Sequence, residues 1–409
     1  MPSCQAQLDV DTARGLTAEV FVVTGTRQWG LEVERIVHRV GNLADRVPYA
    51  ELGSLEGLLS SGSRVSLEPG GQVELSTAPT QDLDALLDGV AADTAELDTR
   101  LSSRGLCAVN RALDIARPPQ RVLARPRYQA MEAFFDARGG AGRWMMCNSA
   151  ALQINLSHDP ADSSRRWQVL HAIAPVLLAT FANSPGLDRA RRSWASLRQG
   201  IWQTIDPART SAPCLTGPPG QAWADYVLAA DVMMIRTGGD AIAVPPGLPF
   251  ARWLKQGHPV GWPTADDLRY HMTTLFPPVR PRGWLEIRVI DALPPYIREI
   301  AVLTVAAAAQ EELADELLRR LPDTRSCWPA AARAGLADDQ LAAAAATLFD
   351  ITARALPRVT RRPERIKAVT DYRGSHVLPR VQPWGGSMTD AALDLTGVPE
   401  LDAMTLAGV

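Results

Sequence analysis

The sequence predicts an α+β fold formed by one domain, with strands concentrated early in the chain and long helices late. Segments in the first third alternate apolar and polar residues with period two, whereas segments after about residue 297 repeat apolar residues at helical spacing. No clean linker divides the 409 residues. We therefore expect a single domain over 1–409, with a strand-rich core over about 21–291, a helical part over about 297–370 and a tail over 371–409.

Period-two alternation identifies the expected strands, and the runs end at turn-forming residues. The expected strands lie within Gly30–Val40, Arg64–Thr77, Leu152–Leu156 and Trp284–Asp291. The second of these ranges holds two runs around the turn Pro69-Gly70-Gly71. Helical spacing of apolar residues predicts the helices Leu83–Arg104, Tyr128–Arg138, Arg165–Asn183, Ser193–Thr204, Ile297–Leu321 and Asp338–Leu356. Two Pro-rich stretches, Ser211–Gly220 and Val244–Pro249, are expected to be loops.

Composition excludes several classes of protein. Hydrophobic residues make up 46% and charged residues 21%, which is typical of a globular chain and not of a disordered one. The net charge of −3 gives no basic character that would indicate nucleic acid as a partner. The longest nearly uncharged apolar run, Ala172–Ala182, is far shorter than the roughly 20 residues that span a bilayer. Five scattered cysteines without a CxxC pair, and no secretory signal over Met1–Val10, favour a cytoplasmic protein.

The outward faces of the expected strands carry an unusual excess of carboxylates. In the first strand Leu31 and Val33 face one way, and Glu32 and Glu34 face the other. The same alternation places further polar residues outward: Glu68, Glu74, Gln153, Asn155, Glu286 and Arg288. One such strand alone is typical of a solvated sheet face, so each segment by itself favours no function.

Together the strands indicate a cation site, provided that they share a sheet. Five carboxylates would then converge against one arginine, and crowding of like charges is costly unless a cation sits among them. Magnesium is the natural partner, because it is a hard ion that prefers oxygen ligands and substrate phosphates. Arg288, two residues after Glu286 on the same face, has the planar fork that suits a phosphate.

Other motifs are weak or missing. The sequence holds no P-loop, no GxGxxG, no HExxH and no GxSxG, and its six histidines show no paired spacing. Arg198 and Trp202 stand four residues apart on one expected helix face. Either the arginine stem simply packs on the indole, or Arg198 binds a carboxylate beside an aromatic wall.

These residues, taken with their neighbours, resemble the glutamate–cysteine ligases of the plant and proteobacterial type. The resemblance rests on Gly30–Glu34, Leu67–Ser76, Met145-Met146, Gln153–Leu156, Ala182–Pro185, Ser196–Trp202 and Asp206–Arg209. It runs from about Phe21 to Asp291, and the EPGGQxELS element within Leu67–Ser76 is its most specific part. The Ala- and Arg-rich style is similar to the actinobacterial branch, which makes γ-glutamylcysteine for ergothioneine biosynthesis.

The resemblance implies a glutamine-synthetase-like fold, a curved antiparallel sheet with a concave face for ATP and metal ions, flanked by helices. It implies two or more Mg²⁺ ions. Carried over by motif, one ion would bind Glu34, Glu68 and Glu74, and a second would bind Glu32, Gln153 and Glu286. Asn155 would lie nearby, Arg288 would hold the γ-phosphate, and Arg198 and Trp202 would bind glutamate. Glu286 and Arg288 are thus the expected catalytic residues.

The chain also departs from the family pattern. The segment Gly186–Arg189 differs from the larger apolar residue and spaced glycines of relatives, and Gln153 stands where more distant relatives carry a histidine ligand.

The implied reaction is the ATP-dependent ligation of the γ-carboxylate of L-glutamate to the amine of L-cysteine through a γ-glutamyl phosphate. The small-molecule partners would be ATP, L-glutamate and L-cysteine, with no nucleic acid and no membrane. Two alternatives stay open: a carboxylate–amine ligase with another amine acceptor, and a non-catalytic binding protein of the same fold. The five carboxylates are all present, which favours a catalyst over the second alternative.

Overall fold

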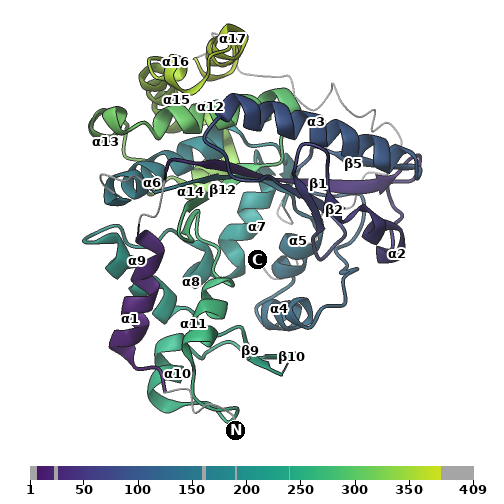
Figure 1. The fold of residues 1–409 in the computed structure, drawn as a ribbon, viewed down its shortest axis with the longest axis vertical. Coiled ribbons are helices and arrows are strands. Elements are labelled where there is room, and N and C mark those ends of the chain that lie inside the picture. The colour runs from purple at the N-terminus through teal and green to yellow at the C-terminus, as the bar shows by residue number, and fades with distance from the viewer. Residues whose placement is uncertain (1–6, 23–25, 159–162, 189–190, 239, 379–409) are drawn as a thin grey trace.

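The computed structural model describes residues 7–22, 26–158, 163–188, 191–238 and 240–378 (Figure 1). Within these residues, eight strands form one antiparallel sheet in the order β11-β12-β6-β1-β4-β3-β2, with β5 paired to the far end of β1. They are β1 (Trp29–Arg39), β2 (Gly57–Leu58), β3 (Arg64–Leu67), β4 (Val73–Ser76), β5 (Leu106–Val109), β6 (Ala151–Leu156), β11 (Val279–Pro281) and β12 (Leu285–Asp291). Two hairpins stand apart: β7 (Gly186–Leu187) with β8 (Ser193–Trp194), and β9 (Met234–Thr237) with β10 (Asp240–Ala243). All the expected strands therefore lie in a single sheet, as predicted.

The register of the sheet brings its polar residues side by side. Glu34 pairs with Glu74 across β1 and β4, and Glu32 pairs with Gln153 across β1 and β6. Directly opposed residues share a face of the sheet and lie close enough to interact. On the next strand the register shifts between Ile287 and Ile290, where β12 has one residue more than β6. This β-bulge bends β12 beside the polar face.

The described residues form seventeen α-helices, several of which cover the two faces of the sheet. They are α1 (Val10–Ala18), α2 (Tyr49–Leu52), α3 (Leu83–Ser102), α4 (Pro126–Asp136), α5 (Ala141–Asn148), α6 (Ser163–Thr180), α7 (Leu197–Ile205), α8 (Pro207–Thr210), α9 (Pro219–Ala229), α10 (Phe250–Gln256), α11 (Ala265–Met272), α12 (Pro295–Ala308), α13 (Ala314–Arg320), α14 (Trp328–Ala334), α15 (Asp339–Ala353), α16 (Leu356–Val359) and α17 (Pro363–Tyr372). Figure 1 shows α3, α12 and α15 on one side of the sheet, and α4, α5 and α7 on the other. None of the described helices is long and apolar enough to cross a membrane.

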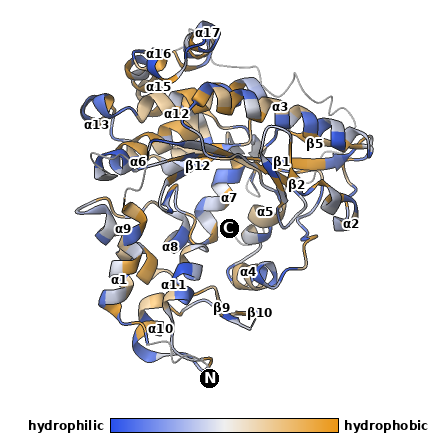
Figure 2. Cartoon of the chain, viewed as in Figure 1, coloured by the Kyte–Doolittle hydropathy of each residue, from blue (hydrophilic) through white to orange (hydrophobic). Residues whose placement is uncertain are grey.

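The hydrophobic core lies between the sheet and the first group of helices. Leu31 and Val33 of β1 belong to the same buried cluster as Leu97 of α3 and Val302 of α12, and apolar colour runs along α12 and β1 in Figure 2. The apolar face of the sheet is thus covered by α3 and α12, which leaves the carboxylate face toward α4, α5 and α7. Because this cluster also includes residues from both ends of the described chain, it supports the proposal of a single domain.

Four of the six expected helices begin and end within three residues of the observed ones, and the other two differ more. The helix expected over Ile297–Leu321 is divided, because Gln310 adopts an extended conformation after α12 and its side chain donates to the carbonyl of Ala306. The helix expected over Ser193–Thr204 begins only at Leu197, since the side chain of Ser196 caps the first turn.

The expected tail begins as regular structure. Its first residues complete α17 and a π-helical turn over Arg373–Val377. The rest of the tail, 379–409, lies outside the described residues.

The turn between β3 and β4 is anchored on the end of α5. Gly70 lies so close to α5 that a Cβ atom there would be 2.0 Å from the carbonyl oxygen of Cys147. The side chain of Gln72 accepts from the amide of Gly70 at 3.0 Å and donates to the carbonyl of Ser149 at 2.8 Å. Arg46 donates to the carbonyl of Gly70 at 2.9 Å. This packing accounts for the EPGGQ sequence and fixes the two ends of the turn that carry Glu68 and Glu74.

We expect Gly70→Ala to lower the free energy of unfolding by about 3 kcal/mol, at the upper end of overpacking costs, because the new methyl group meets backbone atoms. The matched control is Gly89→Ala in α3, where the nearest atom would be 3.6 Å from the Cβ. The control should gain about 0.5–1 kcal/mol from the better helix propensity of alanine. Urea unfolding followed by circular dichroism measures both. Equal stability of Gly70→Ala and the wild type would contradict the close packing of this turn.

Candidate active site

A cavity of about 430 Å³ opens on the polar face of the sheet. Eight of the residues predicted for the site line it: Glu32, Glu34, Glu68, Glu74, Gln153, Arg198, Trp202 and Arg288. The sheet supplies the carboxylates, α7 supplies Arg198 and Trp202, and the opposite wall comes from α4 and α5, including Tyr128 and Met145. The structure therefore brings together residues that are more than 250 positions apart in the chain.

Two predicted residues lie beside the cavity instead of lining it. Asn155 donates to Glu32 at 3.3 Å and accepts from the indole of Trp284 at 3.0 Å, which orients its amide. Glu286 is completely buried, and both of its oxygens accept from arginines.

The four carboxylates of the cavity hold protons more tightly than ordinary glutamates. Burial, together with repulsion from Glu286 and Glu74, raises the pKa of Glu32 to about 7. Burial and the neighbouring Glu34 raise the pKa of Glu74 to about 6, although Ser76 donates to it at 2.8 Å. The pKa of Glu68 is also well above its ordinary value, for the same two reasons. These shifts indicate a cluster that lacks enough positive charge.

Glu286 has the opposite environment. Arg280 grips it with two hydrogen bonds of 2.6 and 2.9 Å, and Arg288 and Arg282 contact it at 2.8 and 3.2 Å. Burial opposes ionisation, but the charges of Arg280, Arg288 and Arg282 outweigh it and hold the pKa of Glu286 below its usual range.

The expectation of five carboxylates against a single arginine is therefore wrong. Arg280 and Arg282 were missed because they follow the prolines at 277 and 278 and flank Pro281, so that their segment has the composition of a loop. It forms β11 and the turn into β12 instead, with Arg280 paired opposite Glu286. A run of arginines within six residues of a strand carboxylate was the signal available in the sequence.

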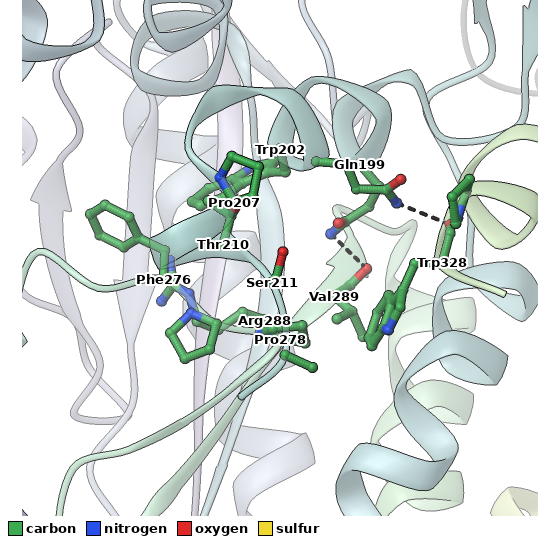
Figure 3. A pocket seen from close by; sticks show the side chains of 14 residues that line it. Gln199, Trp202, Pro207, Thr210, Ser211, Phe276, Pro278, Arg288, Val289 and Trp328 are labelled. Carbon is green, nitrogen blue, oxygen red and sulfur yellow. Dashed lines mark hydrogen bonds between the residues drawn. The ribbon is translucent and has the colours of Figure 1, made fainter. Parts of the chain in front are cut away.

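Arg288 stands where several contacts meet. Its guanidinium donates to Gln153 and Glu286 and lies over the rings of Trp202 and Phe276, at 5.7 and 5.6 Å from their centres. The same three residues, Trp202, Phe276 and Arg288, also line a second cavity of about 250 Å³ (Figure 3). The Nε atom of Arg288 is buried with no hydrogen-bond partner in the described structure. This donor is covered by the surrounding protein, so a neighbouring group must move before an anion can reach it.

Arg198 is held in a similar way, and its Nε atom is also unused. Its Nη1 atom lies 3.3 Å from Asp291, and its Nη2 atom donates to the carbonyl of Arg288 at 3.2 Å. Its Nε atom has no partner among the described residues. The guanidinium faces the ring of Trp202 at 5.8 Å, a contact that is compatible with both interpretations of this pair.

The described chain has no group of three or more His, Cys, Asp or Glu side chains already arranged to hold a metal ion. The donor set nevertheless fits one. Glu32, Glu34, Glu68 and Glu74 offer carboxylate oxygens in one half-buried cavity, and their raised pKa values mark a deficit of positive charge. Hard cations such as Mg²⁺ prefer this oxygen-rich environment.

Comparison with known proteins agrees with this geometry. The model of the glutamate–cysteine ligase family 2 matches residues 28–374.

The chain belongs to that family.

Three relatives extend the match. The glutamate–cysteine ligase EgtA of Mycolicibacterium smegmatis is 38% identical over 340 residues, which cover 80% of each chain. The EgtA enzyme of Mycobacterium tuberculosis is 40% identical over 313 residues, covering 73% of this chain and 72% of the relative. The chloroplast glutamate–cysteine ligase of Medicago truncatula is 28% identical over 64% of this chain and 54% of its own length.

Solved structures show the fold. A glutamate–cysteine ligase from Francisella tularensis in complex with AMP superposes with a TM-score of 0.52 at 14% identity, covering 86% of this chain and 82% of that one. The likeness confirms the predicted α+β class, with an antiparallel sheet at its centre, for this member of the glutamate–cysteine ligase family 2.

The raised pKa values predict a distinctive pH dependence. A carboxylate whose pKa in the folded protein lies above its ordinary value of 4.5 stabilises the fold most below about pH 4.5. This stabilisation is lost as the pH rises through the pKa of the folded protein, which is about 7 for Glu32. Without divalent cations, Glu32→Gln should therefore melt at a higher temperature than the wild type at pH 8, but not at pH 5. Added Mg²⁺ should raise the wild-type Tm more at pH 8 than at pH 5.

Thermal unfolding in EDTA, followed by circular dichroism at both pH values, measures this difference. Glu364→Gln, which removes an exposed carboxylate on α17, is the control and should not respond to pH in this way. A lower Tm of Glu32→Gln at pH 8 would contradict the charge deficit in the cavity.

Proposed function

We propose that this chain is a glutamate–cysteine ligase that joins the γ-carboxylate of L-glutamate to the amine of L-cysteine at the expense of ATP. The observation that carries the proposal is the identity of 38–40% with two EgtA ligases over at least 72% of either chain. The family match over residues 28–374 supports the same activity. We further propose that the product, γ-glutamylcysteine, serves ergothioneine biosynthesis, and that the reaction takes place in the cytoplasm.

The first chemical step would transfer the γ-phosphoryl group of ATP to the side-chain carboxylate of glutamate. This carboxylate is already ionised at neutral pH, so no general base is needed. Phosphoryl transfer depends on positioning and on neutralising charge more than on covalent help from the protein. A cavity rich in arginines and able to take up cations is suited to both. The amine of cysteine would then attack the γ-glutamyl phosphate and expel phosphate.

We propose that two or more Mg²⁺ ions complete the site when ATP is bound. Glu34, Glu68 and Glu74 would hold one ion, and Glu32, Gln153 and Glu286 a second. These ions would neutralise the phosphate oxygens. Since Glu286 is bound by three arginines, it can serve a metal only by releasing one of them. An arginine released in this way would be free to bind a phosphate.

Two arginines have distinct proposed tasks. Arg288 would hold the γ-phosphate, because its side chain lines the cavity beside the carboxylates and its guanidinium lies over the rings of Trp202 and Phe276. Arg198 would bind a carboxylate of glutamate, with Trp202 as the adjacent wall. Arginine suits both because its planar fork matches carboxylate and phosphate oxygens.

The test is release of ADP from ATP by the purified chain. We expect ADP formation to require glutamate and Mg²⁺, to proceed to full turnover only with cysteine, and to stop in EDTA. Arg288→Ala should lower kcat by about 100- to 1000-fold, equivalent to about 3–4 kcal/mol, because charge on the transferred group is stabilised most in the transition state. Direct binding of ATP should weaken much less.

Arg320→Ala, which removes an exposed ion pair with Glu316, is the control and should keep wild-type turnover. An amine other than cysteine that supports faster turnover would replace the proposed acceptor. No glutamate-dependent ADP with any amine would reject the ligase. Equal losses of ATP binding and kcat in Arg288→Ala would make Arg288 a nucleotide anchor instead.

A further inference from the structure

The segment Asn183–Pro185 and the end of β12 meet in a buried junction to which the proposed reaction assigns no role. Asp291, the last residue of β12, has a relative exposure of only 1%. Its Oδ2 atom accepts from the amide of Asn183 at 2.7 Å and from the hydroxyl of Ser184 at 2.8 Å. Its Oδ1 atom accepts from the hydroxyl of Ser196 at 3.0 Å and from Arg198 at 3.3 Å. Four donors thus converge on one buried carboxylate.

A bulge in β12 puts this carboxylate on the side of the cavity. Strict alternation places Glu286 and Arg288 on one face of β12 and Asp291 on the other. The extra residue between Ile287 and Ile290 reverses the alternation, so that Asp291 pairs opposite Ala151. The amide of Ala151 donates to Glu34, a cavity residue. Asp291 therefore reaches the same region as Arg288, which alternation alone does not predict.

The junction fixes the start of α7. Ser196 caps the helix by accepting from the amide of Gln199 at 3.2 Å, and the hydroxyl of Ser184 accepts from the amide of Arg198 at 3.1 Å. Both hydroxyls donate to Asp291, so the carboxylate sets their direction. The backbone of Arg198 is thus tied to the end of β12 before its side chain makes any contact.

The side chain of Arg198 is held from two directions. Asp291 accepts a hydrogen bond from Nη1, and the carbonyl of Arg288 accepts one from Nη2. The Nε atom has no partner in the described structure. The guanidinium is only 3% exposed, so water cannot orient it. With one N–H of each Nη atom engaged, the guanidinium plane has one orientation, and the second N–H of each Nη atom is left for an anion in the cavity that Arg198 lines.

We propose that Asp291 is a positioning residue for substrate binding: it orients Arg198 for the carboxylate of glutamate and joins that site to the strand that carries Arg288. This inference rests on the proposed function, because it takes Arg198 to bind glutamate. Asp291 itself touches no substrate. Its effect should therefore appear in the affinity for glutamate and should depend on Arg198.

Asp291→Asn tests the orientation with little change in shape. The amide of Asn183 can only donate, so the oxygen of the new side chain should stay on it. The new NH₂ group then faces Arg198, which can only donate as well. The variant should raise the KM for glutamate by about 10- to 100-fold, the range for a lost hydrogen bond to a charged group. The KM for ATP should change less than twofold.

A double-mutant cycle with Arg198→Lys shows whether the effect passes through Arg198. Arg198→Lys alone should raise the KM for glutamate, because an ammonium cannot reproduce the planar fork. If Asp291 acts through Arg198, adding Asp291→Asn to Arg198→Lys should raise that KM less than twofold further. Steady-state ADP release with glutamate and ATP varied in turn measures all four proteins.

The control is Asp114→Asn, which removes a charge from another buried ion pair, with Arg117 at 2.6 Å. It should lower the Tm without raising the KM for glutamate. If Asp291→Asn fails to fold, Ser184→Ala removes one hydroxyl of the junction and should raise the same KM by about 3- to 10-fold, as expected for one hydrogen bond of about 1 kcal/mol.

The outcomes separate this inference from the proposed function. Glutamate-dependent turnover by the wild type with an unchanged glutamate KM in Asp291→Asn or Ser184→Ala overturns the role of Asp291 alone. The role of Asp291 would also be overturned if the increase in glutamate KM of the double variant equals the product of the increases in Asp291→Asn and Arg198→Lys. No glutamate-dependent turnover by the wild type rejects the proposed function instead.

Discussion

Crowded carboxylates on one half-buried face of an antiparallel sheet are the constraint around which this molecule is arranged. Repulsion and burial raise the pKa values of Glu32 and Glu74 to about 7 and about 6, so the cluster is incomplete without added positive charge. The protein supplies only part of it. Three of its arginines contact Glu286 at one end of the face, whereas Glu68 and Glu74 at the other end still lack compensating positive charge. Phosphates and cations would both be drawn to this gradient of charge.

Rigid supports keep the charged groups in place. The β3–β4 turn is locked onto α5 through Gly70 and Gln72, which fixes two of the carboxylates. At the opposite end, the bulge in β12 turns Asp291 toward the side of the sheet on which Arg288 lies. Buried polar networks of this kind are stable only when every member has a partner. Arg198 and Arg288 line the cavity and still have N–H groups without a protein acceptor, so a substrate is expected to complete the network at these two side chains.

Alternation along the strands was sufficient to predict the sheet and its carboxylate face, because each strand exposes every second side chain. The same rule failed at β12, because one extra residue in the strand moves Asp291 to the face opposite the one that alternation predicts. It also failed at Arg280, because flanking prolines make a buried strand look like a loop. The start of α7 was predicted too early, since the tertiary contacts of Ser196 decide it. Long-range register, bulges and caps are properties of the folded chain, so local pattern does not reveal them.

Counting bound divalent ions tests the central claim most directly. Mn²⁺ can replace Mg²⁺, and electron paramagnetic resonance distinguishes free from bound Mn²⁺ in the presence of a non-hydrolysable ATP analogue. We expect the wild type to bind at least two Mn²⁺ ions per chain under these conditions. Glu74→Gln and Glu32→Gln should each bind one ion fewer, and the two losses should be independent. Equal Mn²⁺ binding by the wild type and both variants would contradict the account, because the carboxylate face would then hold no cation.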